Sequence, residues 1–279
     1  MIIANLHKQV VALDPSLHRN LRIHQPQMDW SVAAGLNALF VDGTEFGEVC
    51  REYPILFVRA GADAQGKPLM APIAAMGLAP NENLFLQGSG WRAAYIPALL
   101  RAYPFAIGRV GAEQRAVLSL DIGWPGLSRT EGLPLFDEAG EPSQHLQTMH
   151  KQLEHIELEV QRTRELGSLL VAKGLLREMR FDAELPDGQK LTADGFFAVE
   201  EQQLTKLSDA DLVALHRNGV MGLIYAHLVS LGNLRKLVQW RAESTPQTVS
   251  PTKTQGPEAV GGAQSPVSAP PLEGAEDGG

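Results

Sequence analysis

The sequence predicts an α+β fold, in which a mixed and largely antiparallel sheet is covered by a long helix and by C-terminal helices. Short apolar runs separated by glycine and proline dominate residues 1–140, which is typical of strands and ordered loops. Residues 141–176 instead repeat apolar side chains with helical spacing. Because strand signals and helix signals occupy different parts of the chain, α+β is favoured over an alternating α/β arrangement.

The first half of the chain contains runs with the length and composition of β-strands. They are residues 9–13, 54–59, 69–76, 105–110 and 115–122. The run from Pro54 to Val58 is continuously apolar, so we expect that strand to be buried on both faces. Residues 29–37 and 44–53 are candidate short helices, and Asp42-Gly43 marks a turn before the second of them.

A long helix is predicted over residues 142–173. Its apolar positions are separated alternately by three and four residues, which places them on one face: Leu146, Met149, Leu153, Ile156 and Val160, extended by Thr163. Pro142 and Ser143 are suited to the beginning of this helix, and Gly174 to its end. The apolar face is too short for a coiled coil, so we expect it to pack on the sheet.

The remainder of the chain predicts a hairpin followed by helices. Residues 177–185 and 189–192 flank the turn sequence Pro186-Asp187-Gly188, and residues 196–199 form a further short strand. Ser208 and Asp211 have the spacing of a capping box, and Gly219 suits a helix C-terminus. A last helix is predicted over 221–240, weakened by about 1 kcal/mol at Gly232 relative to alanine.

These elements predict one folded domain over residues 1–241, strand-rich over 1–140 and helix-rich over 141–241. Beyond it, residues 242–279 consist mainly of proline, glycine, serine, threonine, glutamine and acidic residues. A segment of this composition cannot bury enough apolar surface to offset its ordering entropy. We therefore expect 242–279 to be a disordered tail.

Composition excludes several classes of protein. The chain has 279 residues and a formal net charge of −8, so a nucleic-acid partner is not expected. Cys50 is the only cysteine, which suits a reducing compartment. The N-terminal residues lack a secretory signal pattern, and no apolar run reaches the length of a membrane helix. We expect a cytoplasmic protein, or alternatively one that reaches the cell surface by a route independent of a signal peptide.

The strongest functional signal is a concentration of aromatic, proline, arginine and acidic residues over 81–105. A rigid segment of this type is suited to holding a protein or peptide partner, because aromatic side chains offer large contact areas and proline fixes the backbone. Aromatic platforms, a cationic anchor and polar specificity groups make up the candidate binding residues: Glu82, Asn83, Trp91, Tyr95, Arg101 and Tyr103.

Two alternatives to this binding surface remain open. In the first, the segment is a loop pinned to the core by its own aromatic side chains, with Arg101 paired to Glu82 or Asp121. In the second, the protein is an enzyme acting on a peptide-like or amino-acid substrate. Its site would combine Arg101 with carboxylates, chosen from Glu45, Glu48, Glu82, Asp121 and Asp137. We favour a non-enzymatic binding protein and assign no catalytic residues.

The sequence contains no motif that predicts a metal site, a cofactor site or a catalytic nucleophile. His145, His150 and His155 recur every five residues, so on a helix they are about 140° apart and cannot share a face. No phosphate-binding loop or nucleophile elbow is present in the sequence. We therefore predict no metal site and no cofactor. His216 and His227 lie among apolar residues and are interpreted as core or boundary side chains.

Several co-linear segments resemble the SapC-like family of bacterial proteins over residues 1 to about 240. The resemblance includes the short motifs His18–Arg22, Glu45-Phe46, Tyr53–Val58, Glu82–Phe85, Gly90-Trp91, Tyr95–Ala98, Arg101–Phe105, Leu135–Asp137, Gly140–Ser143, Gly174–Leu176, Gly195-Phe196, Leu215-His216 and Ser230-Leu231. Ala102 departs from the pattern, in which a second basic residue is common.

The resemblance implies a modest functional expectation. The family takes its name from a protein associated with a paracrystalline surface layer, and it supplies no catalytic set to transfer to this chain. We therefore expect a binding, assembly or accessory protein of surface-layer-related type. A structural component of such a layer is a further alternative, which the missing secretion signal disfavours.

Overall fold

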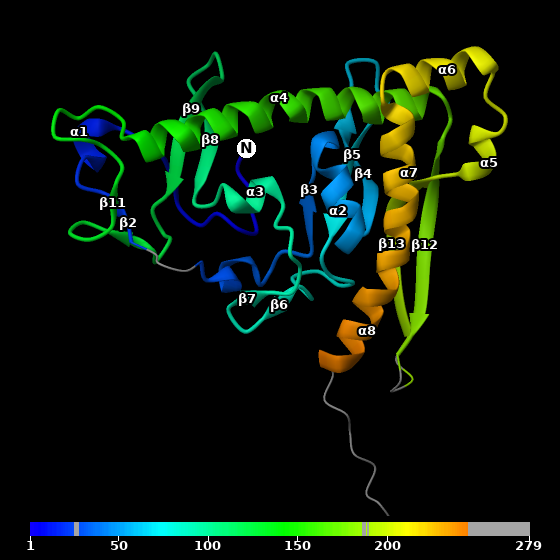
Figure 1. Ribbon diagram of the computed structural model, residues 1–279, viewed down its shortest axis with the longest axis horizontal. Coiled ribbons are helices and arrows are strands. Elements are labelled where there is room, and N and C mark those ends of the chain that lie inside the picture. The colour runs from blue at the N-terminus through cyan, green and yellow to red at the C-terminus, as the bar shows by residue number, and fades with distance from the viewer. Residues whose placement is uncertain (25–27, 186–187, 189, 245–279) are drawn as a thin grey trace, which may run out of the picture. The chain divides into compact units, whose positions relative to one another are not determined.

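The computed structural model describes residues 1–24, 28–185, 188 and 190–244. Two sequence predictions fall partly outside these residues: the turn at 186–187 and the tail from 245 onward. Within the described residues the protein is α+β, with antiparallel sheets, one long helix and helices toward the C-terminus, as the sequence predicts (Figure 1).

One sheet is built entirely from the first half of the chain. It has the strand order β1-β9-β8, with β1 at Val10–Ala12, β8 at Phe105–Val110 and β9 at Arg115–Asp121. All three strands were predicted from their apolar runs. Two small ladders lie outside this sheet. The first pairs β2 (Arg22–Ile23) with β10 (Leu127–Ser128) and β11 (Leu133–Pro134), and the second pairs β6 (Leu86–Gln87) with β7 (Gly90–Trp91).

The larger sheet combines both halves of the chain in the order β12-β13-β4-β5-β3. Its strands are β3 (Ala38–Phe40), β4 (Ile55–Ala62), β5 (Pro68–Ala75), β12 (Leu176–Glu184) and β13 (Lys190–Val199). Burial on both faces is confirmed for Ile55, Leu56 and Phe57 and ends at Arg59, which is exposed.

The prediction of a separate strand at 196–199 is wrong, because these residues continue β13. Gly195 adopts a φ of 78° inside that strand, and the pairing register with β12 shifts between Met179 and Phe181. A β-bulge of this type bends a strand without ending it. The sequence pattern of Asp194-Gly195 is therefore a bulge, although it resembles a turn.

The β12–β13 hairpin joins the rest of its sheet through very few main-chain contacts. Among the described residues, Phe197 and Phe57 are the one pair of ladder partners between β13 and β4. Beside this pair, the His227 ring spans the two strands: Nε2 accepts from the Val199 N–H at 3.0 Å, and Nδ1 lies 2.8 Å from the Ile55 carbonyl oxygen. The His227 side chain thus replaces ladder hydrogen bonds between the two strands. Ser230 accepts from the Ile55 N–H at 2.8 Å, which holds the same helix against β4.

Helix α4 (Gln144–Ala172) confirms the predicted long helix and packs on both sheets, chiefly against β5 and also against β8 (Figure 1). Ser143 caps its first turn by accepting from the Leu146 N–H, and Gly174 follows its end with a φ of 64°. Gly167 allows the helix to approach β5 closely, since a Cβ there would lie 2.0 Å from the Met70 carbonyl oxygen.

The remaining helices are short. They are α1 (Pro15–His18), η1 (Trp30–Ala33), η2 (Gly43–Glu45), α2 (Phe46–Glu52), α3 (Ala98–Arg101), α5 (Glu201–Leu204), α6 (Asp209–Arg217), α7 (Val220–Ser230), η3 (Leu231–Asn233) and α8 (Leu234–Ser244). The single helix predicted over 221–240 is wrong, because a 3₁₀ turn interrupts it at 231–233. The buried Asn233 amide donates to the carbonyl oxygens of Cys50 and Tyr53, which fixes this tighter turn.

Candidate functional site

Helix α2 holds the aromatic segment 81–105 in place through two carboxylates. Glu52 accepts hydrogen bonds from the backbone N–H groups of Ala94 and Tyr95, at 3.0 and 2.9 Å. Glu45 accepts from the Tyr95 hydroxyl and from the Ala98 N–H, both at 2.7 Å. Glu45 is the N-cap of α2 and Glu52 is its last residue, so the two carboxylates lie seven residues, or about two helical turns, apart on one side of the helix. The backbone over 94–98 is therefore anchored to this helix.

Glu45 is a buried carboxylate at the base of this anchor, with 6% of its surface exposed. Burial raises its pKa above the ordinary glutamate value, although the hydrogen bonds from Tyr95 and Ala98 oppose the shift. Burial also raises the pKa of the Tyr95 hydroxyl, and the hydrogen bond to Glu45 raises it further. The Tyr95 hydroxyl is consequently a neutral donor to Glu45 at physiological pH.

Trp91 belongs to an aromatic stack that continues into the core. Its ring lies 5.8 Å from that of the fully buried Phe85, which stacks at 4.2 Å on Tyr53 and meets Trp240 edge-on at 5.0 Å. The Trp91 indole N–H donates to the Tyr53 hydroxyl at 2.7 Å. Trp91 is half-buried, so only part of the predicted contact platform faces solvent.

Glu82 and Asn83 hold the loop that follows β5. The Glu82 carboxylate accepts from the N–H groups of Leu78 and Ala79 and pairs with Arg241 of α8. The Asn83 side chain donates to the Ala33 carbonyl oxygen and accepts from the Phe85 N–H. The polar groups of both residues are therefore used inside the chain.

Tyr103 lies in the interior, with 5% of its surface exposed, and its hydroxyl donates to Asp121 at 3.3 Å. Asp121 is fully buried and also accepts from the backbone of Lys8, Gln9 and Gly123. Burial alone would raise the pKa of this carboxyl, but the four hydrogen bonds outweigh burial and lower it. This pair anchors the entry to β1.

Tyr95 and Arg101 form the exposed part of the segment. The Arg101 guanidinium is exposed and lies 5.4 Å from the centre of the half-buried Tyr95 ring. Among the described residues, no carboxylate lies within ion-pair distance of Arg101. A cleft of about 290 Å³ adjoins Tyr95 and is lined by Glu48, Arg51, Glu52 and Ala94. We refer to Tyr95, Arg101 and these lining residues as the Tyr95 surface.

The structure separates most of the candidate acids. Glu82 pairs with Arg241 and Asp121 with Tyr103, so the sequence-based alternative that Arg101 pairs with one of them is wrong. Glu45 alone approaches Arg101, since both contact the Tyr95 hydroxyl.

The histidines of α4 do not form a metal site with the described acidic residues around them. His150 lies 3.6 Å from Glu154 on α4. Within the described residues, no group of three or more histidine, cysteine or acidic side chains is placed to hold a metal ion.

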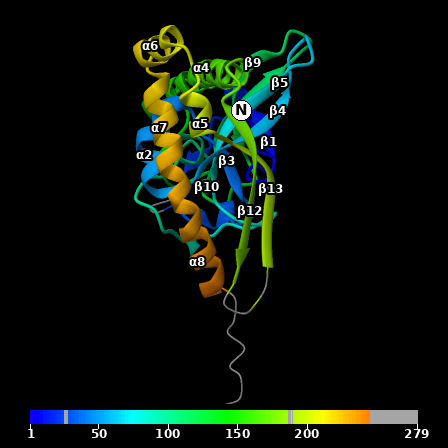
Figure 2. The ribbon, with the colours of Figure 1, turned by 90° about the vertical axis from the view of Figure 1, so that its right-hand side faces the viewer.

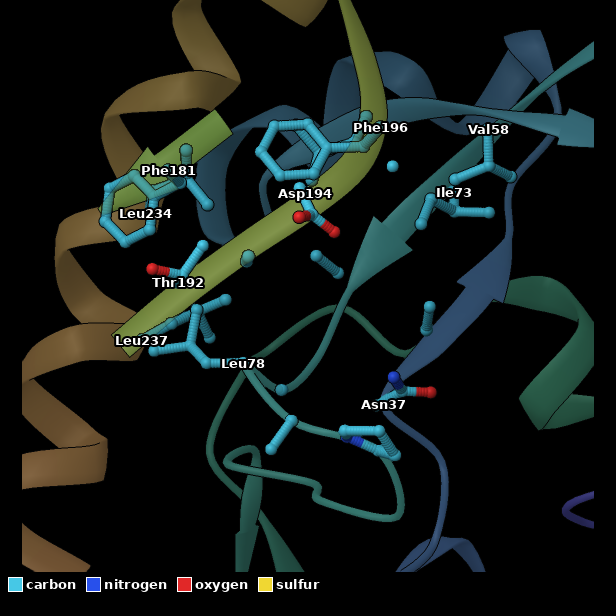
Figure 3. Close-up of a pocket in the computed structure, with 18 residues that line it drawn as sticks. Asn37, Val58, Ile73, Leu78, Phe181, Thr192, Asp194, Phe196, Leu234 and Leu237 are labelled. Carbon is cyan, nitrogen blue, oxygen red and sulfur yellow. The ribbon is translucent and has the colours of Figure 1, made fainter. Parts of the chain in front are cut away.

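A cavity that the sequence did not predict lies between α8 and the larger sheet, including the β12–β13 hairpin of that sheet (Figure 3). Its volume is about 410 Å³. The walls are mainly apolar and include Val58 and Ile73 from the sheet, Phe181 and Phe196 from the hairpin, and Leu234 and Leu237 from α8. Figure 3 shows Asp194 projecting from β13 into the space among these side chains. No described side chain pairs with its carboxylate.

Two features of the site were not predicted from the sequence: the anchoring role of Glu52 and the cavity. The role of Glu52 could have been predicted, because its spacing from Glu45 places both side chains on one side of a predicted helix. The cavity had no such signal, because its lining comes from α8 and from strands far apart in the chain that meet only in the larger sheet.

Comparison with known proteins gives one match. The model of the SapC family matches residues 13–237 of this chain. No curated protein and no solved structure matches it. None of the helices in the described part of the chain has the length and apolar character required to cross a membrane.

Proposed function

Because this chain belongs to the SapC family, we propose that it is a binding or assembly protein of surface-layer-related type. The Tyr95 surface engages a protein or peptide partner. The observation that carries the proposal is the exposed Arg101 guanidinium, stacked on Tyr95 without an anionic partner among the described residues. Tyrosine and arginine are enriched among residues that dominate binding energy.

The anchoring of this surface supports the proposal further. Glu45 and Glu52 fix the backbone and the Tyr95 ring before any partner arrives, so little conformational entropy is lost on binding. Arg101 is suited to a carboxylate, with which a guanidinium forms paired hydrogen bonds. The partner segment is therefore expected to carry an acidic side chain or a C-terminal carboxylate.

Charge reversal at Arg101 tests this function. The tagged full-length protein is used to capture partners from cells of its native host, and the captured proteins are identified by mass spectrometry. We expect a set of proteins that is retained by wild type and by R129E, a matched change at another exposed arginine, and lost by R101E. Identical sets for all three proteins would contradict the proposal. Trp91 is unsuitable for this test, because its removal also disrupts the aromatic stack.

The cavity supports a second candidate function, the binding of a small apolar molecule that carries one cationic group. A volume of about 410 Å³ falls within the range of ligand pockets, and Asp194 supplies a carboxylate without a described partner. Thermal denaturation with hexylamine and with hexanol tests this candidate. Hexylamine should stabilise wild type but not D194N, whereas hexanol should affect both equally. Equal responses of wild type and D194N to hexylamine would contradict this second function.

A further inference from the structure

A groove of about 510 Å³ lies between α4 and the corner at which α6 meets α7. Figure 1 shows this corner beside the C-terminal half of α4. Asn218 and Gly219 form the corner, where Gly219 adopts a φ of 78°. The described lining of this groove shares no residue with the cavity that Asp194 enters or with the cleft beside Tyr95. Its volume lies within the range of small-molecule sites, which makes it a separate candidate site.

Apolar side chains line the groove from two helices. Leu166 and Leu169 come from α4, and Val220 and Leu223 come from α7. Leu169 and Leu223 are half-buried, so part of the apolar surface that faces the groove is in contact with water. An apolar group that enters the groove removes this surface from water, and its removal stabilises the complex.

Two charged side chains, Glu159 and Arg162, also line the groove from α4. Positions 159, 162, 166 and 169 are separated by three or four residues, so they lie one above another on the same face of the helix. The Thr163 hydroxyl beside them accepts from the Gly43 N–H at 3.0 Å, which holds the turn before α2 against this part of α4. The groove therefore combines an apolar wall with a carboxylate and a guanidinium.

Glu159 is a buried carboxylate with few internal partners. It is 4% exposed, and among the described residues its side chain accepts one hydrogen bond, from the Arg162 guanidinium at 2.5 Å. The other buried acids, Asp42, Glu45 and Asp121, accept at least two each. A buried charge is costly unless it is paired and hydrogen-bonded. Since a carboxylate can accept about four hydrogen bonds, Glu159 retains acceptor capacity in the wall of the groove.

Arg162 supplies the complementary donors. Its side chain is 64% exposed, and among the described residues its one hydrogen bond is the bond to Glu159. A guanidinium has five N–H donors, so most of them are left for a ligand. An ammonium group and a carboxylate on one carbon atom match this pair, because each meets the opposite charge in a charge-assisted hydrogen bond. An apolar side chain on the same carbon then lies along the leucines of the groove.

We propose that this groove binds a free α-amino acid with an apolar side chain. The ammonium group meets Glu159, the carboxylate meets Arg162, and the side chain lies between α4 and α7. This site does not depend on the functions proposed for the Tyr95 surface and for the cavity that Asp194 enters. A ligand of this size in an open groove is expected to have a dissociation constant on the order of 0.1–1 mM.

Saturation-transfer NMR of the full-length chain with L-phenylalanine tests the ligand class. Three related molecules each lack one feature: hydrocinnamate lacks the ammonium group, phenethylamine lacks the carboxylate, and glycine lacks the apolar side chain. Each should bind at least about tenfold more weakly than phenylalanine, since a charge-assisted hydrogen bond or the apolar contact is lost. Phenylalanine that gives no saturable signal up to about 10 mM would overturn the proposal. Equal binding of phenylalanine and phenethylamine would also overturn it, because Arg162 would then have no role.

Substitutions at the two charged residues test the location of the site. E159Q and R162Q should each weaken phenylalanine binding at least about tenfold. Two variants serve as controls and should bind phenylalanine like wild type. R164Q changes an exposed arginine of α4 that is not part of the groove lining, and D194N removes the carboxylate of the other cavity. Loss of binding in D194N would place the ligand in that cavity and contradict the proposal.

The double variant E159Q/R162Q separates binding from folding. A single change leaves one charge without its partner, whereas the double change removes both charges and leaves two amides that can hydrogen-bond to each other. Circular dichroism should therefore show a folded protein with a melting temperature close to that of wild type. The same protein should bind phenylalanine at least about tenfold more weakly than wild type. Wild-type affinity in this folded variant would contradict the assigned roles of Glu159 and Arg162.

Discussion

The aromatic segment 81–105 and helix α7 differ in how residue type relates to exposure. Trp91, Tyr95 and Tyr103 have the composition of a contact surface, yet hydrogen bonds to Tyr53, Glu45 and Asp121 hold them wholly or partly inside the protein. Helix α7 has the composition of a core helix, yet Val229 is 70% exposed.

The difference has a physical origin. Tyrosine and tryptophan can be buried at low cost when neighbouring elements supply acceptors for their polar atoms. Here the acceptors are the two residues that flank α2, Glu45 and Tyr53, and Asp121 of β9. An apolar helix is buried only where other elements cover it, and the described part of this chain covers one side of α7. Residue type thus indicates what a side chain can do, and topology decides whether it faces outward.

The largest change in stability is expected for a substitution inside the aromatic segment, which tests whether this segment stabilises the fold. F85A should destabilise the protein by about 3–5 kcal/mol, because it leaves a cavity among three large rings. Phe85 is fully buried and contacts Tyr53, Trp91 and Trp240. Urea denaturation at neutral pH measures the change. A loss below about 1 kcal/mol would mean that this stack contributes little to the core.

The next effect concerns the inner side of α7. Burial lowers the pKa of His227 to about 4, although the hydrogen bond to Ile55 opposes the shift. The neutral ring stabilises the fold fully above pH 6.5, and this contribution is lost as pH falls toward 4. Stability should therefore decrease by about 2 kcal/mol between pH 7.5 and pH 5 from this residue alone.

H227Q provides the control for this pH dependence, since glutamine offers a donor and an acceptor but does not titrate. Urea denaturation at both pH values should show a smaller difference for H227Q than for wild type. The pKa values of His7 and His145 are also lowered, mainly by burial, so part of the dependence should remain. An unchanged pH dependence in H227Q would show that His227 is not the group responsible.

A smaller effect compares the two regions directly. Y95F removes the hydroxyl that donates to the buried Glu45 carboxylate and should cost about 1–2 kcal/mol. Y225F removes an exposed hydroxyl from α7 and should change stability by a few tenths of a kcal/mol at most. Parallel urea denaturation of both variants measures the contrast. Equal losses of stability in Y95F and Y225F would contradict the conclusion that Tyr95 is held inside the protein whereas Tyr225 is exposed.

The smallest effect is expected for V229S. This change should alter the free energy of unfolding by less than about 0.5 kcal/mol, because Val229 is already largely in contact with water. A loss of more than about 1 kcal/mol would indicate that the side chain packs inside the monomer.

Much of the fold could be predicted because local signals and tertiary structure agree. The runs at 105–110 and 115–122 became the β8–β9 hairpin, and the apolar face from Leu146 to Val160 became the buried side of α4. Errors occurred where tertiary contacts changed a local signal. Gly195 forms a bulge inside β13, and the Asn233 side chain tightens the turn that divides α7 from α8.

The candidate site was predictable only in part. The sequence indicated the segment 81–105 and its exposed Arg101, but it could not show that Tyr103 and Glu82 already had partners on distant elements. Arg241 lies far along the chain from Glu82, and Asp121 meets Tyr103 only because β8 pairs with β9. Composition alone contains no information about such contacts, so only the folded structure distinguishes the buried aromatic residues from the exposed ones.

The position of His227 and Ser230 on the inner side of α7 has a consequence for regulation. His227 joins the hairpin that lines the cavity to β4, and Ser230 bonds to β4 beside it, while Tyr225 and Val229 occupy the opposite side of the same helix. A small displacement of this helix would shift both sides at once.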